Sequence, residues 1–474
     1  MANSVEKSDP PNLAVSSGIG TGNSFSTVPF FRRPDWLSFG LTAGVILAVY
    51  LYTIAPEVTL EFSGVLATGA AYAGVPHPPG YPVWTVYSWF FVKLLPGSNI
   101  AWRVAIGSAL ASALTCGLVA LMVSRGGALL LEHRVGFSPW KPGEQDLLGV
   151  VCGYVAGMAL GLSRVVWQKA VIADTWALGV LLFATMLCLL MRWMVTPERK
   201  RFLLEAAFVF GLLLTSNQEL IVLTPSLLLL VMLGDQELGR DLFPLSAFLA
   251  ITNWLGSKFA LFPWVDYYAV GNGPLLLAFL LAAVAAVIAM IRTRRVGFEW
   301  KPAVLCALVL LLGLGCYVYL PIASMTNPPM NWGYARTVQG FVHVVTRGQY
   351  ERPHPTDELG RFVAQLWTIT KETGKGFGWL YFTFAVLPFY VSRQAGRTAR
   401  NWLLGLIAVF IGTGPLVVAA LNPSADLAGL QMVAPYFCPM YVVLAVWTGL
   451  GLVVLGTLVL SPIGSKNSSC RTSC

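Results

Sequence analysis

Charged side chains are scarce in this sequence. Asp, Glu, Lys and Arg make up only 11% of its 474 residues, whereas soluble domains carry about 25%. Because 56% of the residues are hydrophobic, more than one globular core can bury, the composition excludes a secreted or cytosolic globular protein. The net charge of +9 does not indicate nucleic-acid binding, since the basic residues are scattered in short clusters between apolar runs.

Metal-binding and disulfide motifs are also lacking. The eight Cys and four His form no CxxC pair and no Cys/His cluster, so the sequence predicts no metal, no cofactor and no disulfide framework. A cleavable signal sequence is missing too, because the Ser-, Gly- and Pro-rich residues 1–35 lack its basic-then-apolar order. We expect residues 1–35 to be a disordered cytoplasmic tail.

Long uncharged apolar runs are abundant, and their length suits helices that cross a bilayer. They predict an all-α polytopic membrane protein with about twelve transmembrane helices within residues 36–460, followed by a cytoplasmic tail at 461–474. The predicted spans are 36–55, 102–124, 147–163, 175–193, 202–216, 219–234, 242–261, 274–291, 302–320, 378–392, 401–421 and 438–460.

The stretch 81–95 is apolar as well, but it follows a proline-rich bend and is crowded with aromatic residues, which is typical of a helix lying in the membrane interface. If this stretch were a span, every later loop would lie on the opposite side of the membrane. With 81–95 interfacial and the N-terminus inside, roughly two thirds of the 31 Lys and Arg fall on the cytoplasmic side, as the positive-inside rule requires. Both termini are then cytoplasmic, and the outer segments are 56–101, 164–174 and 321–377.

The first outer segment contains an acid and a rigid bend, and an arginine follows it at the outer mouth of the second span. Glu61 lies just beyond the first span, where a carboxylate can take a proton from a hydroxyl acceptor; a capping or solvated acid is an equal alternative. The prolines at 76–82 make a stiff bend that positions His77, either as a structural histidine or as a phosphate ligand. Arg103 suits a phosphate, or is an interfacial arginine that reaches towards water.

The other outer segments add polar groups. Asp174 opens an apolar run, so it is either a helix N-terminal acid or a second acid of the site. Asn217 and Gln218 lie at a polar tip between two spans. The third segment combines aromatic, amide and guanidinium groups, which hold sugar faces, hydroxyls and phosphates; an amphipathic surface helix would look similar. Its candidate binding residues are Trp332, Arg347 and Tyr350.

Taken in order, these motifs resemble the transmembrane protein 260-type O-mannosyltransferases, which belong to the GT-C superfamily of polytopic glycosyltransferases. The resemblance covers roughly residues 36–440, and its most specific run is His-Pro-Pro-Gly-Tyr-Pro. The motifs that carry it are Glu61-Phe62-Ser63-Gly64, His77-Pro78-Pro79-Gly80-Tyr81-Pro82, Trp167…Ala173-Asp174, Ser216-Asn217-Gln218 and Asn331-Trp332-Gly333…Arg347-Gly348-Gln349-Tyr350.

The resemblance implies a GT-C-like helix bundle, a lipid-phosphate sugar donor used on the non-cytoplasmic side, and an acid of the first outer loop as catalytic base. It adds Tyr81 to the substrate-binding candidates. One departure is clear: the family pattern usually has an acid at the positions of Phe62 and Val65. Glu61 must therefore replace those acids, or the protein has lost transferase activity.

The sequence thus predicts a membrane glycosyltransferase that moves a sugar, mannose by resemblance, with inversion from a polyprenyl-phosphate donor to a hydroxyl on a protein, lipid or glycan. Glu61 is the expected base and Asp174 its helper or an acceptor ligand, while Arg103 and Arg347 are expected to bind the departing phosphate. A transporter or flippase of a lipid-linked substrate and an inactive scaffold are the alternatives. The expected location is a bacterial inner membrane, with an endoplasmic reticulum membrane as the alternative.

Overall fold

The computed structural model describes residues 29–60, 62–97, 99–132, 142–244, 246, 273–294, 300–350, 355–424, 429 and 432–468. The predicted tail at 1–35 therefore lies mostly outside the described residues, as does the predicted span at 242–261. Within the described residues every regular element is a helix, and the only β-type pairing is a single bridge between Val75 and Asn331. The predicted all-α class is confirmed.

Six helices or continuous helix runs are long and apolar enough to cross a membrane, and a seventh forms if α5 (Pro142–Gly161) and α6 (Arg164–Ala170), bent by 72°, count as one broken span. The predicted count of twelve is not confirmed. Several predicted spans correspond to shorter helices, including α8 (Arg201–Ser216) and α9 (Thr224–Gly234). The six runs are α1 (Arg33–Thr53), α4 (Ile100–Leu131), α7 (Trp176–Val195), Trp300–Met325 (α12, η3 and α13), Arg397–Leu421 (α18 and α19) and Ala434–Val459 (η6 and most of α21).

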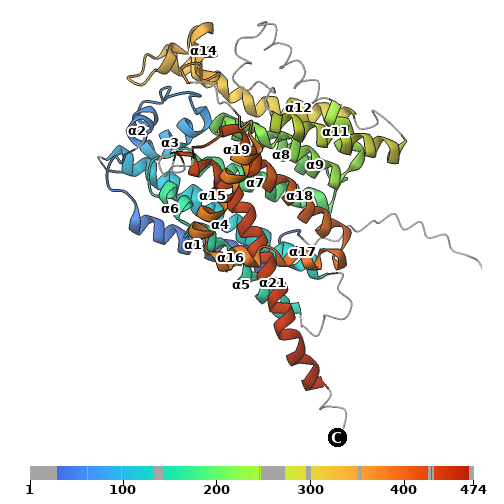
Figure 1. Ribbon diagram of the computed structural model, residues 1–474. Helices are drawn as coiled ribbons and strands as arrows, with labels where there is room; N and C mark the ends of the chain where they lie inside the picture. Colours follow the sequence, from blue (N-terminus) through green and yellow to red (C-terminus); the bar gives the residue numbers. More distant parts are fainter. Residues whose placement is uncertain are drawn as a thin grey trace, which may run out of the picture.

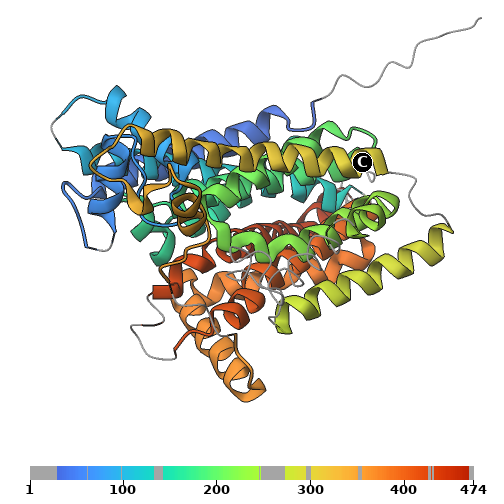
Figure 2. The same ribbon diagram turned by 90° about the horizontal axis from the view of Figure 1, so that it is seen from above.

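The remaining helices are short or lie between these runs (Figures 1 and 2). The element predicted as interfacial is α3, whose 13 residues span about 20 Å, too short to cross the hydrocarbon core. The bounds are α2 (Ser63–Ala71), α3 (Pro82–Leu94), η1 (Gln218–Leu223), α11 (Gly273–Thr293), α12 (Trp300–Leu314), η3 (Gly315–Val318), α13 (Tyr319–Met325), η4 (Trp332–Tyr334), α14 (Val338–Val345), α15 (Leu359–Phe377), α16 (Trp379–Phe384), α17 (Leu387–Val391), η5 (Ser392–Gln394), α18 (Arg397–Thr413), α19 (Pro415–Leu421), η6 (Ala434–Phe437) and α21 (Cys438–Ser468).

A glycine stripe lets α5 approach α4 closely. Gly153 and Gly157 lie one turn apart on α5, and a Cβ atom at either position would meet the backbone carbonyl of Ala120 or Cys116 at 2.6 and 2.7 Å. Small residues spaced by four are the usual means of bringing membrane helices together, because packing rather than water drives their association. The stripe therefore fixes α5 directly against both α4 and α1.

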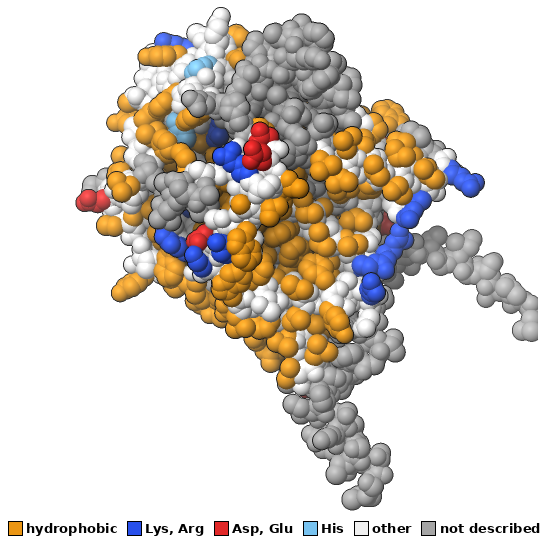
Figure 3. All heavy atoms as spheres, in the orientation of Figure 1, with side chains coloured by type: hydrophobic (Ala, Val, Ile, Leu, Met, Phe, Trp, Pro, Cys, Tyr) orange, Lys and Arg blue, Asp and Glu red, His pale blue; other side chains and the backbone are white. Residues whose placement is uncertain are grey.

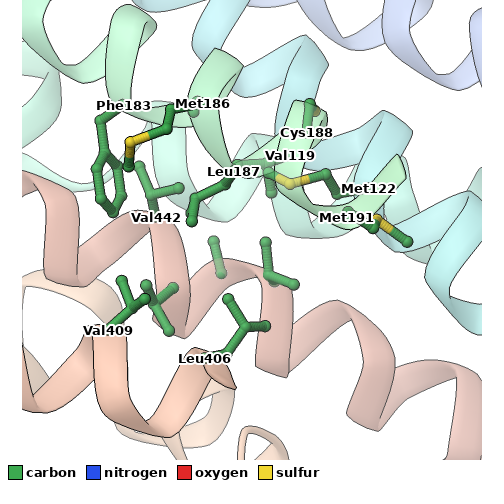
Figure 4. Close-up of a cluster of buried hydrophobic side chains, with 14 of the residues drawn as sticks. Val119, Met122, Phe183, Met186, Leu187, Cys188, Met191, Leu406, Val409 and Val442 are labelled. Atoms are coloured by element: carbon green, nitrogen blue, oxygen red, sulfur yellow. The ribbon is translucent and has the colours of Figure 1, made fainter. Parts of the chain in front are cut away.

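The core lies where α4, α7, α18 and α21 converge. Figure 4 shows side chains from all four helices meeting, among them Met122 of α4, Phe183 of α7, Leu406 of α18 and Val442 of α21. Each of these four side chains is fully buried. The core holds the four helices together, and the segments 56–101 and 164–174, predicted to be outer, lead directly into α4 and α7.

Candidate active site at the outer segments

The first and third outer segments are joined, although about 250 residues separate them. The amide of Val75 donates to the carbonyl of Met330 at 2.8 Å, and the amide of Trp332 donates to the carbonyl of Val75 at 3.0 Å. Gly74 is required at this junction, because a Cβ there would lie 2.3 Å from the Met330 carbonyl oxygen. Figure 1 accordingly shows α2 and α3 beside the segment that carries α14.

The proline bend positions His77 and starts α3. Tyr81 caps α3 in a left-handed conformation and Pro82 follows at its first position, where proline's fixed torsion suits a helix start. The buried ring of His77 lies between Phe62 and Tyr81, at centroid distances of 4.5 and 5.1 Å. Burial and the neighbouring charge of Arg347 lower the pKa of His77 to about 4, so this histidine is neutral at pH 7.

The tautomer of His77 follows from its contacts. Its Nδ1 lies 3.0 Å from the carbonyl oxygen of Pro78, which can only accept, so Nδ1 carries the proton and donates it there. The hydroxyl of Tyr350 lies 3.4 Å from the same nitrogen. Nε2 is then the acceptor of the ring, and a neutral His77 can hydrogen-bond a hydroxyl but cannot supply charge to a phosphate.

Six of the sequence-predicted residues gather with Glu219 in a polar group, called here the Arg347 cluster, in which only Tyr350 is exposed. Arg347 Nη2 lies 3.7 Å from Glu219 Oε2, and both side chains are about 15% exposed. Burial raises the pKa of Tyr81, with Arg347 opposing and Glu219 and Tyr350 adding to the rise, so its phenol stays protonated. The members are His77, Tyr81, Asn217, Gln218, Glu219, Arg347 and Tyr350.

Two amides of the cluster have defined packing roles. Asn217 donates from Nδ2 to Glu219 at 3.3 Å, and its Oδ1 lies against the backbone of α7 at Gly179, where a Cβ would overlap it. Gln218 donates from Nε2 to the carbonyl of Val345 at 3.0 Å. These contacts join η1 to α7 and to the end of α14, and they hold Arg347 beside Glu219.

Asp174 lies in a separate arrangement at the start of α7. Its Oδ1 accepts from the amide of Trp176 at 2.7 Å, which is the predicted helix N-terminal role. Its Oδ2 lies 3.2 Å from the ammonium of Lys169 on α6. Its backbone carbonyl accepts from the buried indole of Trp84 at 2.9 Å. Asp174 is therefore both a helix-starting acid and half of an ion pair.

Lys169 lines a cavity with a volume of about 900 Å³, called here the α6–α15 cavity. Its walls come from α6, from α15, from η6 and from the start of the first outer segment at Thr59 and Leu60. Figure 3 shows basic and acidic side chains side by side over the region of α6 and α15. The charged lining residues are Arg164, Lys169, Glu372 and Lys375.

Tyr436 links the cavity to the Arg347 cluster. Its ring lies 5.0 Å from that of Trp176, edge to face, and its hydroxyl is close enough to Tyr81 to act on the pKa of that phenol. Its chain neighbours Pro435 and Phe437 line the cavity. The two polar regions are therefore adjacent.

The predicted residues thus divide into five groups. Six lie in the Arg347 cluster. Asp174 lies by the cavity, and Trp332 lies at the Val75 junction, where its indole also donates to Gln349. Arg103 instead donates to the carbonyl of Val92 at 2.6 Å and so holds α4 to the end of α3; its predicted phosphate role stays a prediction. Glu61 lies outside the described residues.

Sequence reasoning missed three basic residues of the cavity. Arg164 and Lys169 lie in the second outer segment and Lys375 ends α15, which places the last some 200 residues from the others. The available signal was the pair of cations on a seven-residue helix after a sharp bend. Glu219 was also missed as a partner of Arg347, since nothing local connects two residues so far apart in the chain.

Part of this sequence matches a known protein family. Residues 63–239 match the family model described as the protein O-mannosyl-transferase TMEM260 N-terminal domain. This match confirms the predicted resemblance to that family over these residues. A mouse (Mus musculus) relative named protein O-mannosyl-transferase TMEM260 is 25% identical over 324 residues, which is 66% of this chain and 35% of the mouse protein. The chain therefore spans about a third of the length of that relative.

The family match covers only part of the site. It includes His77, Tyr81, Asp174 and the Asn217–Glu219 turn, and it begins just after Glu61. Arg347, Tyr350 and Lys375 lie beyond it. Within the described residues, no group of three or more His, Cys, Asp or Glu side chains is arranged to hold a metal ion.

Proposed function

We propose that this protein is a membrane glycosyltransferase that moves a sugar from a polyprenyl-phosphate donor to a hydroxyl acceptor on the non-cytoplasmic face. Its family and the printed name of the mouse relative support sugar transfer, with mannose as the sugar. The observation that carries the proposal is the α6–α15 cavity, because three basic side chains line it and the loop towards Glu61 enters it.

The cavity suits a phosphate attached to a long apolar chain. Arg164, Lys169 and Lys375 outnumber the one acid of the lining, Glu372, which lies 2.8 Å from the Lys375 ammonium. They therefore supply net positive charge where a phosphate must be held and later released. On α15, the side chains of Leu359, Val363 and Trp367 are exposed at four-residue spacing, whereas Ile369 and Thr373 line the cavity. One side of α15 therefore offers an apolar stripe to a bilayer interface, and another side borders the proposed phosphate site.

The proposed reaction uses one acid and the cavity cations. Glu61 removes the proton from the acceptor hydroxyl, whose oxygen forms a bond to the anomeric carbon while the bond from that carbon to the phosphate oxygen breaks. The transition state has oxocarbenium character, and the cavity cations stabilise the negative charge that develops on the departing polyprenyl phosphate. Inversion at the anomeric carbon follows from this single displacement.

The Arg347 cluster is the proposed sugar-binding wall. Neutral His77 offers Nε2 as an acceptor for a hydroxyl, and Tyr350 and Trp332 offer rings that suit a sugar face. Asp174 orients Lys169 towards the cavity. Arg347, paired with Glu219, serves mainly to organise this wall.

The test is turnover of radiolabelled polyprenyl-phosphate mannose by purified protein. Glu61→Gln should lower the rate at least a hundredfold, the usual contribution of a general base, whereas Glu57→Gln, an exposed acid of the same loop, should leave the rate unchanged. Lys375→Gln should raise the KM for the donor, and Lys371→Gln on the same helix, which lies over the ring of Trp367, should not. Unchanged turnover in Glu61→Gln contradicts the assignment of the base.

The alternatives give other results in the same experiment. A flippase moves a fluorescent lipid-linked sugar across vesicles without forming a glycosylated product. An inactive scaffold shows no turnover in the unmodified protein, and Phe62→Asp restores it.

A further inference from the structure

An apolar groove on another part of the molecule lies between α11 and α18, with α9 as its floor. Its volume is about 420 Å³. α9 packs against both neighbouring helices, and Asn401 of α18 fastens α9 by donating to the carbonyl of Leu233 at 2.7 Å. The groove is lined mainly by aliphatic side chains, including Leu229, Met232, Leu281, Ile288, Leu404 and Ile411.

The length of the groove is close to the thickness of the hydrocarbon region of one bilayer leaflet. Its lining runs from Leu404 to Leu416 along the helices α18 and α19, which at 1.5 Å per residue is about 18 Å, against about 15 Å for half of the hydrocarbon core. α19 contacts α11 and so narrows the end at Leu416. The rims at Leu281 and Ile411 are exposed by 58% and 45%, so the groove opens sideways along its length.

The other end of the groove is basic. Arg292, in the last turn of α11, lines it, and Arg400 lies one turn before Leu404 on the same face of α18. Both arginines are exposed. The groove lining contains no acid, and the nearby Asp235 is bound by Lys200 at 2.5 Å. Figure 3 shows Lys and Arg side chains gathered at the edge of the hydrophobic face, in the region where α11 ends and α18 begins.

We propose that this groove binds one phospholipid with an anionic headgroup. An acyl chain fills the apolar length, and the phosphate lies at the level of Arg292 and Arg400, an arrangement in which basic pockets between membrane helices select acidic lipids. Charge complementarity favours this occupant over a second copy of the chain, since two copies would bring like-charged ends together. The inference uses no residue of the proposed transferase site.

Native mass spectrometry of the detergent-purified protein with added phosphatidylglycerol or phosphatidylcholine tests the proposal. The unmodified protein should bind phosphatidylglycerol more tightly than phosphatidylcholine. Each arginine should contribute about fivefold to this affinity, so the double variant Arg292→Gln/Arg400→Gln should bind phosphatidylglycerol at least tenfold more weakly. Binding of phosphatidylcholine should be unchanged in this variant. Arg393→Gln, an exposed arginine outside the groove lining, is the matched control.

A second variant tests the apolar part of the groove. Ala285→Phe fills it and should lower the binding of both lipids. Equal binding of phosphatidylglycerol by the unmodified protein and the double arginine variant would overturn the proposal. The proposal would also be overturned if the protein formed a dimer that Ala285→Phe dissociates. Crosslinks that place another segment of this chain in the groove would overturn it as well.

Discussion

The ammonium of Lys169 lies 3.2 Å from Oδ2 of Asp174, and both side chains are nearly buried. Lys169 faces the α6–α15 cavity, whereas Asp174 is fixed to the start of α7 by the amide of Trp176. The acid therefore sets the position of a cation in the proposed donor site. Under the proposed function, the sequence-predicted Asp174 acts as a positioning residue through Lys169.

Asp174→Asn should raise the donor KM and lower the free energy of unfolding by about 1–3 kcal/mol, because it removes the charge that compensates a nearly buried ammonium. Lys169→Gln should raise the donor KM as well. The double variant should lose less stability than the sum of the losses in the two single variants, as expected for residues in contact. Thermal unfolding and initial rates measure both effects, and strictly additive losses contradict the pairing.

The Arg347–Glu219 pair should be strongly coupled. Arg347→Gln leaves the carboxylate of Glu219 beside buried Asn217, and removing one partner of a buried pair typically costs about 3–5 kcal/mol. Glu219→Gln should cost a similar amount, and the two changes together should cost less than their sum. Arg336→Gln, an exposed arginine that donates to Asn327, is the control in the same segment, and a loss of stability equal to that of Arg347→Gln would contradict the coupling.

The glycine stripe of α5 gives a test of the fold. Gly153→Ala should destabilise the protein by about 1–3 kcal/mol, the usual cost of overpacking, because its Cβ would lie 2.6 Å from both the Ala120 carbonyl and Ser38 Oγ. Gly143→Ala on the same helix meets nothing within 4 Å and should change stability by less than about 0.5 kcal/mol. Equal melting temperatures for the two variants would show that α5 and α4 are not so tightly packed.

Local patterns in the sequence predicted those parts of the structure that depend on neighbouring residues. The apolar run 175–193 corresponds to α7, and the proline bend before Tyr81 starts a short helix, as its torsions require. Contacts between distant segments were beyond such reasoning. Arg103 has backbone partners at the end of α3, which no side-chain pattern reveals.

The same limit explains the cavity and the span count. Lys375 joins Arg164 only because α15 folds back against α6, a contact that depends on the whole bundle. The predicted count of twelve spans came from hydropathy alone, which does not reveal where an apolar run is broken into shorter helices. The stretch 378–392, predicted as one span, forms α16, α17 and part of η5.

The neutrality of His77 predicts a dependence of stability on pH. The pKa of this side chain is lowered from 6.5 to about 4 by burial and by Arg347. The unfolded chain therefore binds a proton between pH 6.5 and pH 4 while the folded chain does not, so the contribution of His77 to stability is complete above pH 6.5 and is lost as the pH falls towards 4. The loss should reach at most about 3 kcal/mol.

A comparison of variants isolates this contribution from the carboxyl groups that titrate over part of the same range. His77→Gln should show a smaller fall in melting temperature between pH 7 and pH 4.5 than the unmodified protein, whereas His343→Gln, at an exposed position of α14, should show the same fall. Arg347→Gln should reduce the effect partly, because it removes the charge that assists burial in lowering the His77 pKa. If His77→Gln and His343→Gln melt with identical pH profiles, His77 is not held neutral by the Arg347 cluster, and its proposed role as a hydroxyl acceptor at Nε2 loses its physical basis.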